Sequence, residues 1–314
     1  MRSRILLCGI SAAALLAGTT ACGSSKSSGG GSGSMGDELK GASFTVSSKD
    51  FTESILLGKI TEYLLQAHGA KFTDKTDIKG SVNTRTALTS GQVDMYWEYT
   101  GTAWITYQKN TTPVSDPTDQ YDKVKAADAA NGIAWLNPAP MNDTYAFATR
   151  AGQADKLGVH TLSDLAKLSP SDATFCIESE FSTRDDGFPG MTKAYGLTVG
   201  KGQTKMLDTG VIYTETAKGG TCNFGEVFAT DGRISALKLT VLKDDKHFFP
   251  NYNAALTLKQ SLLTKYPAIA TIVNPVAAKL DDATMTELNA EVDAQGLPAD
   301  QVAKDWLKKN GFTK

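Results

Sequence analysis

The feature that most constrains the fold is an alternation of strand-like and helix-like segments. Residues 43–47 alternate in polarity and are rich in β-formers, and apolar residues then recur at helical spacing from Phe51 to Ala67. Asp50 is expected to cap this helix, with Glu53 reaching back to it, and Gly69 to end it. A strand at 93–97 and a helix around 104–107 follow. This order predicts a parallel sheet flanked by helices.

The same alternation continues to the end of the chain. Further strands are predicted at 145–149, 174–177, 226–229 and 237–242, and further helices at 84–90, 162–168, 191–195, 211–216, 257–266, 269–280 and from 283 onward. The body from about residue 42 to 312 is therefore predicted to be α/β. Its length suits two α/β lobes, and ligands of such folds bind at the carboxyl ends of strands, between the lobes.

Composition excludes some classes of protein. The chain has 314 residues, of which 41% are hydrophobic and 21% charged, with a net charge of -2. These values are typical of a globular protein and lack the basic excess of a nucleic-acid binder. No apolar run reaches the length of about 20 residues that a membrane-spanning helix needs.

The N-terminus has the pattern of an export signal. Arg2 and Arg4 precede an uncharged apolar run over 5–18, and Cys22 follows small residues. This pattern resembles a bacterial lipoprotein signal, which implies removal of residues 1–21, lipidation of Cys22 and a Gly/Ser-rich tether over 22–41. An ordinary cleavage site beside a chance cysteine is the alternative. The expected location is extracytoplasmic, anchored to a membrane, on the cell surface or in a periplasm.

Cysteine and histidine usage favours a binding protein over an enzyme. Cys176 and Cys222 remain after export, and an even pair in an oxidising compartment predicts a disulfide. The chain has three histidines, none in a recognisable catalytic arrangement, and the sequence contains no phosphate-binding loop, metal-ligand cluster or serine nucleophile motif. We therefore expect no cofactor and no covalent chemistry.

Aromatic residues gather in three predicted loops. These loops cover 97–102, 142–145 and 248–253, each with polar neighbours. A methylated ammonium has no N–H donor, so aromatic ring faces rather than hydrogen bonds hold it, at roughly 0.5–2 kcal/mol per ring. Ordinary core packing is the alternative reading of these rings.

Four motifs resemble the glycine betaine/choline-binding proteins of ABC osmoprotectant importers. They lie at 47–54 (SSKDFTES), 94–102 (DMYWEYTGT), 230–234 (TDGRI) and 242–250 (LKDDKHFFP), and the match runs in order from about 44 to 311. The resemblance implies a type II periplasmic-binding fold of two lobes, each a mixed sheet flanked by helices, with the ligand cleft between them. We expect residues 42–144 and 251–314 to form one lobe and 145–250 the other. It also implies a monomeric receptor that delivers its solute to a membrane permease.

The resemblance also implies the walls of an aromatic box around a quaternary amine. Carried over by motif, the walls are Tyr99, Tyr145, Tyr252 and, where the family usually has Tyr, Phe228. Phe keeps the ring face but lacks the hydroxyl, so the exact solute stays open among glycine betaine, choline, carnitine and related osmolytes. A different, uncharged or aromatic solute is the alternative, to which Trp97 could contribute.

Polar partners complete the expected site. Thr102 and Asp143 belong to the motifs of the ring walls, and Arg184 matches an arginine that in the family meets the ligand carboxylate. A planar guanidinium suits that bidentate contact, although an ion pair with a neighbouring aspartate at the surface is the alternative. Weaker candidates near the cleft floor are Lys49 and Thr52. Glu98 is expected either to offset the ligand's charge or to support another site residue.

Overall fold

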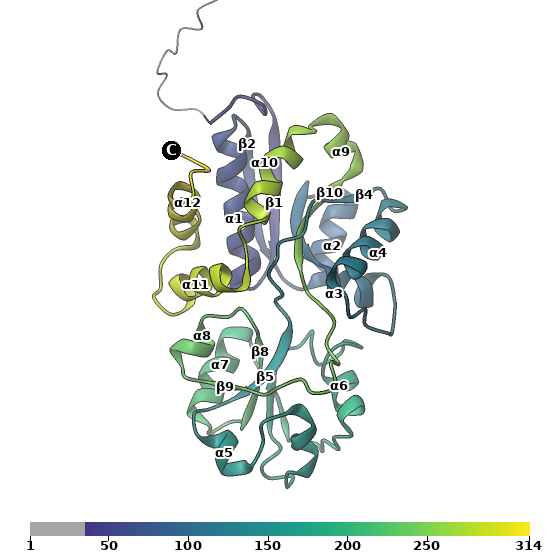
Figure 1. Cartoon of the computed structure of the whole chain (residues 1–314), viewed down its shortest axis with the longest axis vertical. Helices are drawn as coiled ribbons and strands as arrows, with labels where there is room; N and C mark the ends of the chain where they lie inside the picture. The colour runs from purple at the N-terminus through teal and green to yellow at the C-terminus, as the bar shows by residue number, and fades with distance from the viewer. Residues whose placement is uncertain (1–34) are drawn as a thin grey trace, which may run out of the picture. The chain divides into compact units, whose positions relative to one another are not determined.

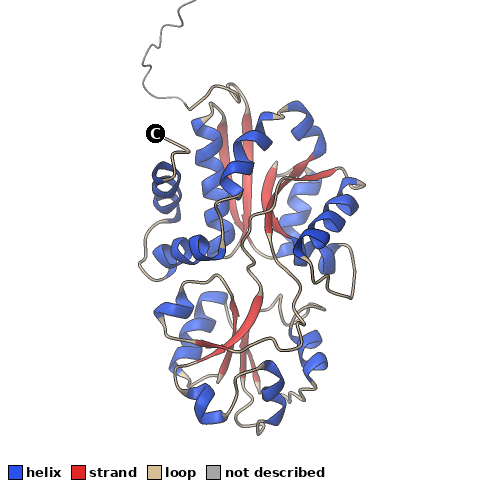
Figure 2. Cartoon of the chain, viewed as in Figure 1, coloured by secondary structure: helices blue, strands red, loops and turns tan. Residues whose placement is uncertain are grey.

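The computed structural model describes residues 35–314 (Figure 1). The expected signal peptide, Cys22 and most of the tether lie outside the described residues. The described part contains two five-stranded sheets, each with helices packed on it (Figure 2). We call the first sheet with its helices the first lobe and the second sheet with its helices the second lobe. No helix of this part is long and apolar enough to cross a membrane.

The first sheet has the strand order β2-β1-β3-β10-β4. Its strands are β1 (Ser43–Lys49), β2 (Lys71–Ile78), β3 (Met95–Tyr99), β4 (Ile133–Trp135) and β10 (Ala254–Lys259). Strand β1 pairs in parallel with β2 and β3, whereas β10 runs antiparallel to β3 and β4. The helical segments of this lobe are α1 (Thr52–Ala67), α2 (Ser81–Ser90), α3 (Thr100–Thr102), a π-helical turn (Ala103–Tyr107), α4 (Pro117–Ala129), α9 (Gln260–Lys265), α10 (Ala268–Ala277), α11 (Asp282–Asp293) and α12 (Ala299–Lys309).

Alternate residues of β3 face two different layers of helices. Trp97 packs in one apolar cluster with α1, α10 and α12, while Tyr96 packs in another with α2 and α4. Because successive side chains of a strand point to opposite faces, the sheet is covered on both sides. This burial explains why β3 and β10 are apolar along almost their whole length.

The second sheet has the strand order β7-β6-β8-β5-β9. Its strands are β5 (Tyr145–Thr149), β6 (Phe175–Ile177), β7 (Thr204–Met206), β8 (Phe224–Phe228) and β9 (Thr240–Val241). Strand β6 is parallel to β7 and β8, and β5 is antiparallel to β8 and β9. The helices are α5 (Gln153–Leu157), a 3-10 helix (Leu162–Lys167), α6 (Phe188–Tyr195), α7 (Thr209–Lys218) and α8 (Arg233–Ala236). The predicted fold class of two mixed sheets flanked by helices is confirmed.

The chain passes between the two sheets twice, over residues 136–144 and 242–253. Both crossings lead directly into or out of a strand that ends near the other lobe. Residues on the crossings and at the strand ends can therefore face the space between the sheets.

Several local predictions were wrong. The sequence favoured a helix over 257–266, but residues 254–259 form the strand β10 and only 260–265 are helical. A short apolar run fits a buried strand and a helix equally, and the two neighbouring strands settle the choice. Asp50 does not cap α1; Phe51 is the N-cap residue, and the Asp50 carboxylate accepts from the backbone N–H of Gly80 at 3.0 Å. The strand expected at 237–242 covers only 240–241.

Candidate ligand-binding site

A cavity of about 440 Å³ opens where strand ends of both sheets meet. Its lining comes from the residues after β1, β3 and β6, the end of β8, the start of β5, the start of α2 and the second crossing. The lining residues are Lys49, Asp50, Phe51, Lys79, Gly80, Ser81, Asn83, Tyr99, Thr102, Asp143, Tyr145, Glu178, Ser179, Glu180, Thr183, Thr209, Glu226, Phe228 and Tyr252. The carboxyl ends of parallel strands thus supply much of the site, as expected for an α/β fold.

Five rings form a continuous aromatic wall along this cavity: Phe51, Tyr99, Tyr145, Phe228 and Tyr252. Phe51 stacks on Phe228 at 5.1 Å between ring centroids and lies 5.6 Å from Tyr99. Tyr145 lies 5.3 Å from Phe228 and meets Tyr252 edge to face at 5.2 Å. These separations are those of attractive ring pairs, so the wall holds its own shape.

The second sheet places two of these rings together through its register. Tyr145 of β5 is paired directly with Phe228 of β8, so both side chains stand on the same face of the sheet. Glu226 precedes Phe228 by two residues and points the same way. One face of β8 therefore offers the cavity both a ring and a carboxyl group.

Glu53 and Asp143 form a buried carboxyl pair next to the wall, and Asp143 also lines the cavity. The Tyr99 hydroxyl donates to Glu53 at 3.0 Å, and the Thr230 oxygen lies 2.5 Å from Glu53 and 2.7 Å from Asp143. Burial raises the pKa of Glu53, and burial followed by the charge of Glu53 raises that of Asp143. A hydroxyl has one proton to donate, so the two short contacts of Thr230 require a proton on one of the carboxyls. Asn289 also donates to Glu53, at 3.1 Å.

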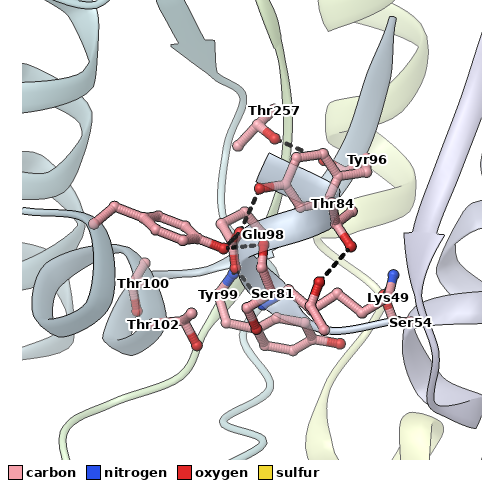
Figure 3. A network of polar contacts seen from close by, with 12 residues as sticks. Lys49, Ser54, Ser81, Thr84, Tyr96, Glu98, Tyr99, Thr100, Thr102 and Thr257 are labelled. Atoms are coloured by element: carbon pink, nitrogen blue, oxygen red, sulfur yellow. Dashed lines mark hydrogen bonds and ion pairs between the residues drawn. The ribbon is translucent and has the colours of Figure 1, made fainter. Parts of the chain in front are cut away.

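Lys49 is held by a network centred on Glu98 (Figure 3). The Lys49 ammonium donates to Glu98 at 2.5 Å, and the hydroxyls of Tyr96 and Tyr107 donate to the same carboxylate at 2.5 and 2.8 Å. Glu98 is fully buried and does not line the cavity. Of the two roles expected for Glu98, the geometry fits support of Lys49, whose ammonium lies 5.0 Å from the Tyr99 ring centre.

Arg184 lies outside the lining of this cavity and faces an adjoining cavity of about 240 Å³. Its guanidinium donates twice to Asp186, at 2.7 and 2.5 Å, and once to Glu180, at 2.8 Å. A longer contact of 3.4 Å reaches the hydroxyl of Thr102. The ion pair with a neighbouring aspartate, which the sequence left as an alternative, is thus present, but it is buried rather than at the surface. Asp186 also accepts from the Tyr252 hydroxyl at 2.6 Å, so this ion pair braces the aromatic wall.

Two other sequence candidates do not reach the cavity. Thr52 begins α1, lies outside the lining of the 440 Å³ cavity, and its hydroxyl donates to Asp293 of α11 at 2.7 Å. Trp97 is buried in the core of the first lobe, where its indole N–H donates to Thr61 at 2.8 Å. The turn into α1 directs Phe51 to the cavity and Thr52 away from it.

The charged lining is mainly acidic. Five carboxyl groups, those of Asp50, Asp143, Glu178, Glu180 and Glu226, line the cavity together with two ammonium groups, those of Lys49 and Lys79. Burial raises the pKa of Glu226 and of Glu178. Burial also acts on Glu180, but the charges of Arg184 and Lys49 outweigh it and lower its pKa to about 2. Acidic side chains therefore outnumber basic ones in the lining.

The two lobes touch across the cavity. The Glu180 carboxylate of the second lobe accepts from the backbone N–H of Ser81, the first residue of α2, at 2.8 Å. An anionic group at a helix N-terminus is favourable because the first N–H groups of a helix lack partners within it. Glu180 therefore connects Arg184 of the second lobe to α2 of the first.

Cys176 and Cys222 form a disulfide, with their α-carbons 5.7 Å apart. Both are buried in the second lobe, away from the cavity lining. The bond fastens the loop before β8 to strand β6.

Sequence reasoning missed Phe51, Glu180 and Glu226 as lining residues. Phe51 was assigned to the apolar face of the following helix, although its position directly after a strand was a signal for the cavity. Glu226 stands inside a predicted strand with no motif around it. Within residues 35–314, no group of His, Cys, Asp and Glu side chains is arranged to hold a metal ion.

Comparison with known proteins gives a consistent picture. Residues 42–309 match the family described as the substrate-binding domain of ABC-type glycine betaine transport systems. A glycine-betaine-binding protein of Pseudomonas aeruginosa is 38% identical over 273 residues, covering 84% of this chain and 87% of that protein. A Helicobacter pylori ergothioneine transport permease and ergothioneine-binding protein is 34% identical over 85% of this chain, which corresponds to 47% of that longer protein. A crystal structure described as a glycine betaine/carnitine/choline ABC transporter aligns with a TM-score of 0.70 and 27% identity, over 86% of this chain and 98% of that one.

Proposed function

Because the chain belongs to the family of substrate-binding domains of ABC-type glycine betaine transport systems, we propose that its cavity holds a small quaternary-amine osmolyte. The chain is a transport protein with a type II periplasmic-binding fold and not an enzyme. The proposed solutes are glycine betaine, choline, carnitine and close relatives. The observation that carries this proposal is the aromatic wall beside a mainly acidic lining.

The aromatic wall suits a methylated ammonium. Its rings are partly or wholly buried, and each can contribute roughly 0.5–2 kcal/mol to a cation at its face. Three such contacts sum to roughly 1.5–6 kcal/mol of attraction for the ammonium group. A primary ammonium would need hydrogen-bond acceptors at close range, whereas a quaternary one needs ring faces and a negative field.

Arg184 has a supporting role in this proposal. Its guanidinium already donates two hydrogen bonds to Asp186 and one to Glu180, and makes a longer contact with the hydroxyl of Thr102. A ligand carboxylate could reach it only by displacing one of these acids. We therefore assign Arg184 to holding Asp186, and through it Tyr252, in the wall.

Closure of the lobes is the proposed signal to the transporter. The contact between Glu180 and Ser81 joins the lobes next to the cavity, so a ligand that fills the cavity can stabilise the closed arrangement. We propose that the closed form delivers its solute to an ABC permease. Substrate-binding proteins of ABC importers are extracytoplasmic, which agrees with a cavity exposed to the solute pool outside the cell.

We also propose that a lipid on Cys22 anchors the protein to the membrane. The proposal rests on the sequence around Cys22 alone. Mass spectrometry of the protein from its native membrane should find a diacylglyceryl group on Cys22. A Cys22→Ser variant recovered from the membrane in the same amount as the wild type would count against the anchor.

A second candidate is a bulkier betaine or an uncharged aromatic solute. The cavity volume and the ring of Phe228 in place of Tyr favour it, as does the ergothioneine-binding name of the Helicobacter pylori relative. This candidate predicts affinity that follows ring size and does not require a positive charge.

Calorimetry with matched ligands separates the two candidates. Choline and its neutral carbon isostere 3,3-dimethylbutanol have nearly the same shape and differ in charge. The proposed function predicts that choline, glycine betaine or carnitine binds more tightly than about 1 mM, and that the neutral isostere is at least about tenfold weaker than choline. If no quaternary amine binds a folded sample, or if the isostere binds equally well, the proposed function is wrong.

A further inference from the structure

Glu226 is a buried carboxyl group of the cavity with an acceptor position to spare. It lies in β8, at the centre of the second sheet, and is 3% exposed. One carboxylate oxygen accepts from the backbone N–H of Glu178 at 2.7 Å. Among the described residues no donor contacts the other oxygen, Oε1, although Glu226 lines the cavity.

The position of Glu226 relative to the aromatic wall is fixed by the strand. Glu226 and Phe228 are two residues apart on β8, so they share a face and stand about 7 Å apart along the strand. Phe228 in turn pairs with Tyr145. A ligand whose ammonium lies at the rings can therefore direct a second polar group, on a short arm, toward Glu226.

The other charged groups make this end of the cavity unsuitable for a bare carboxylate. Lys49 is engaged by Glu98, Lys79 is exposed to solvent, and Arg184 is engaged by Asp186 and Glu180 outside the lining. A ligand carboxylate directed at Glu226 would meet another acidic group, whereas a ligand hydroxyl or N–H group would find the Oε1 acceptor.

We propose that Glu226 determines specificity by accepting a hydrogen bond from the ligand, so that this cavity selects quaternary amines carrying a hydroxyl or N–H donor over those that carry none. The inference rests on the proposed function, because it assumes that the ammonium lies at the aromatic wall. It specifies the chemical class of the ligand group that lies at Glu226, namely a hydrogen-bond donor. A site with a buried polar group rejects a ligand that leaves this group unpaired much more strongly than it rejects a change in size.

The test compares choline with its methyl ether, in which a methyl group replaces the hydroxyl proton, and uses tetramethylammonium as a probe for the rings alone. Calorimetry on the wild type should give choline at least about tenfold tighter binding than the methyl ether. In a Glu226→Leu variant the ratio should fall to about one, and in Glu226→Gln, which keeps a neutral acceptor, it should be intermediate. A ratio within one variant does not depend on how much of the sample is folded.

Asp50→Asn is the matched control. Asp50 is a second carboxylate of the lining, but it is exposed and its Oδ1 accepts from Gly80. The Asp50→Asn change should lower the affinities for choline and the methyl ether equally, because it changes only the electrostatic field in the cavity. The ratio of the two affinities should stay unchanged.

The outcomes distinguish this inference from the proposed function. The inference is wrong if choline and the methyl ether bind the wild type with similar dissociation constants, or if Glu226→Leu keeps the wild-type ratio of the two constants. In either case Glu226 does not accept a hydrogen bond from the ligand, while the proposed cation site is unaffected. Glycine betaine binding more tightly than choline would also overturn the inference. If tetramethylammonium, choline and the methyl ether all fail to bind, the proposed function itself is wrong.

Discussion

Phe51 offers the sharpest test of the aromatic wall, because its ring contacts two other wall residues. It stacks on Phe228 at 5.1 Å and lies 5.6 Å from Tyr99, and it is partly exposed to the cavity. Replacing it with Ala removes one ring face from the cation and two ring pairs from the free protein.

The two losses have different magnitudes and can be measured separately. One cation–π contact at a partly desolvated site is worth about 1–2 kcal/mol, which corresponds to a loss of affinity of about 5- to 30-fold. Each ring pair contributes about 0.5–1.5 kcal/mol, so the free protein should lose about 1–3 kcal/mol of unfolding free energy. Urea unfolding without ligand gives the second quantity, and calorimetry with choline gives the first.

Phe51→Leu separates the ring face from simple bulk. Leu keeps apolar volume but has no negative face, so it should bind choline nearly as weakly as Ala does while restoring part of the stability. Phe72→Leu is the control, since Phe72 is a partly buried ring of the same lobe that packs on Tyr63 outside the cavity. Wild-type affinity in Phe51→Leu would refute the cation–π argument.

Three further changes have directions fixed by the structure. Burial raises the pKa of Glu62 to about 7, so the folded protein should lose about 3 kcal/mol of stability as pH rises from about 4.5 to 7, and urea unfolding of Glu62→Gln should not show this loss. Glu180 behaves oppositely, because the charge of Arg184 outweighs burial and lowers the pKa of Glu180 to about 2. Ionised Glu180 should therefore stabilise the folded protein by up to about 3 kcal/mol above about pH 4.5, and this stabilisation should be lost as the pH falls toward 2. Acid titration of Glu180→Gln should lack that loss, and an unchanged profile would exclude the ion pair as its source. Opening the disulfide through Cys176→Ala and Cys222→Ala frees a loop of sequence separation 46 and should cost about 4 kcal/mol, measured as a lower urea midpoint, while ligand affinity measured below that midpoint stays unchanged.

The sequence carried the class of fold because periodicity is a local property. Strands at 145–149, 174–177 and 226–229 were predicted close to β5, β6 and β8, since each is a short apolar run between polar turns. The edge strand β2 was missed, because most of its residues are polar and exposed and its pairing with β1 is what makes it a strand. Strand β10 was mistaken for a helix for the converse reason: its apolar residues fit both patterns.

Site prediction divided in the same way. Motifs placed Tyr99, Tyr145, Tyr252 and Phe228 at one cavity, because strand ends of an α/β fold converge. The partners of Arg184 depended on distances between side chains that no motif encodes. Asp186 and Glu180 lie within four residues of Arg184 in the sequence. The sequence nevertheless did not show that both would accept hydrogen bonds from its guanidinium.

The sequence by itself determined the alternation of strands and helices, the family and four rings of the wall, because these follow from local patterns and motifs. Tertiary structure alone decided that Phe51 completes the wall, that Thr52 turns away, and that Glu226 offers the cavity an acceptor. The physical reason is that burial, field and free hydrogen-bonding capacity arise from groups far apart in the chain, and only the folded arrangement sets which of them are neighbours.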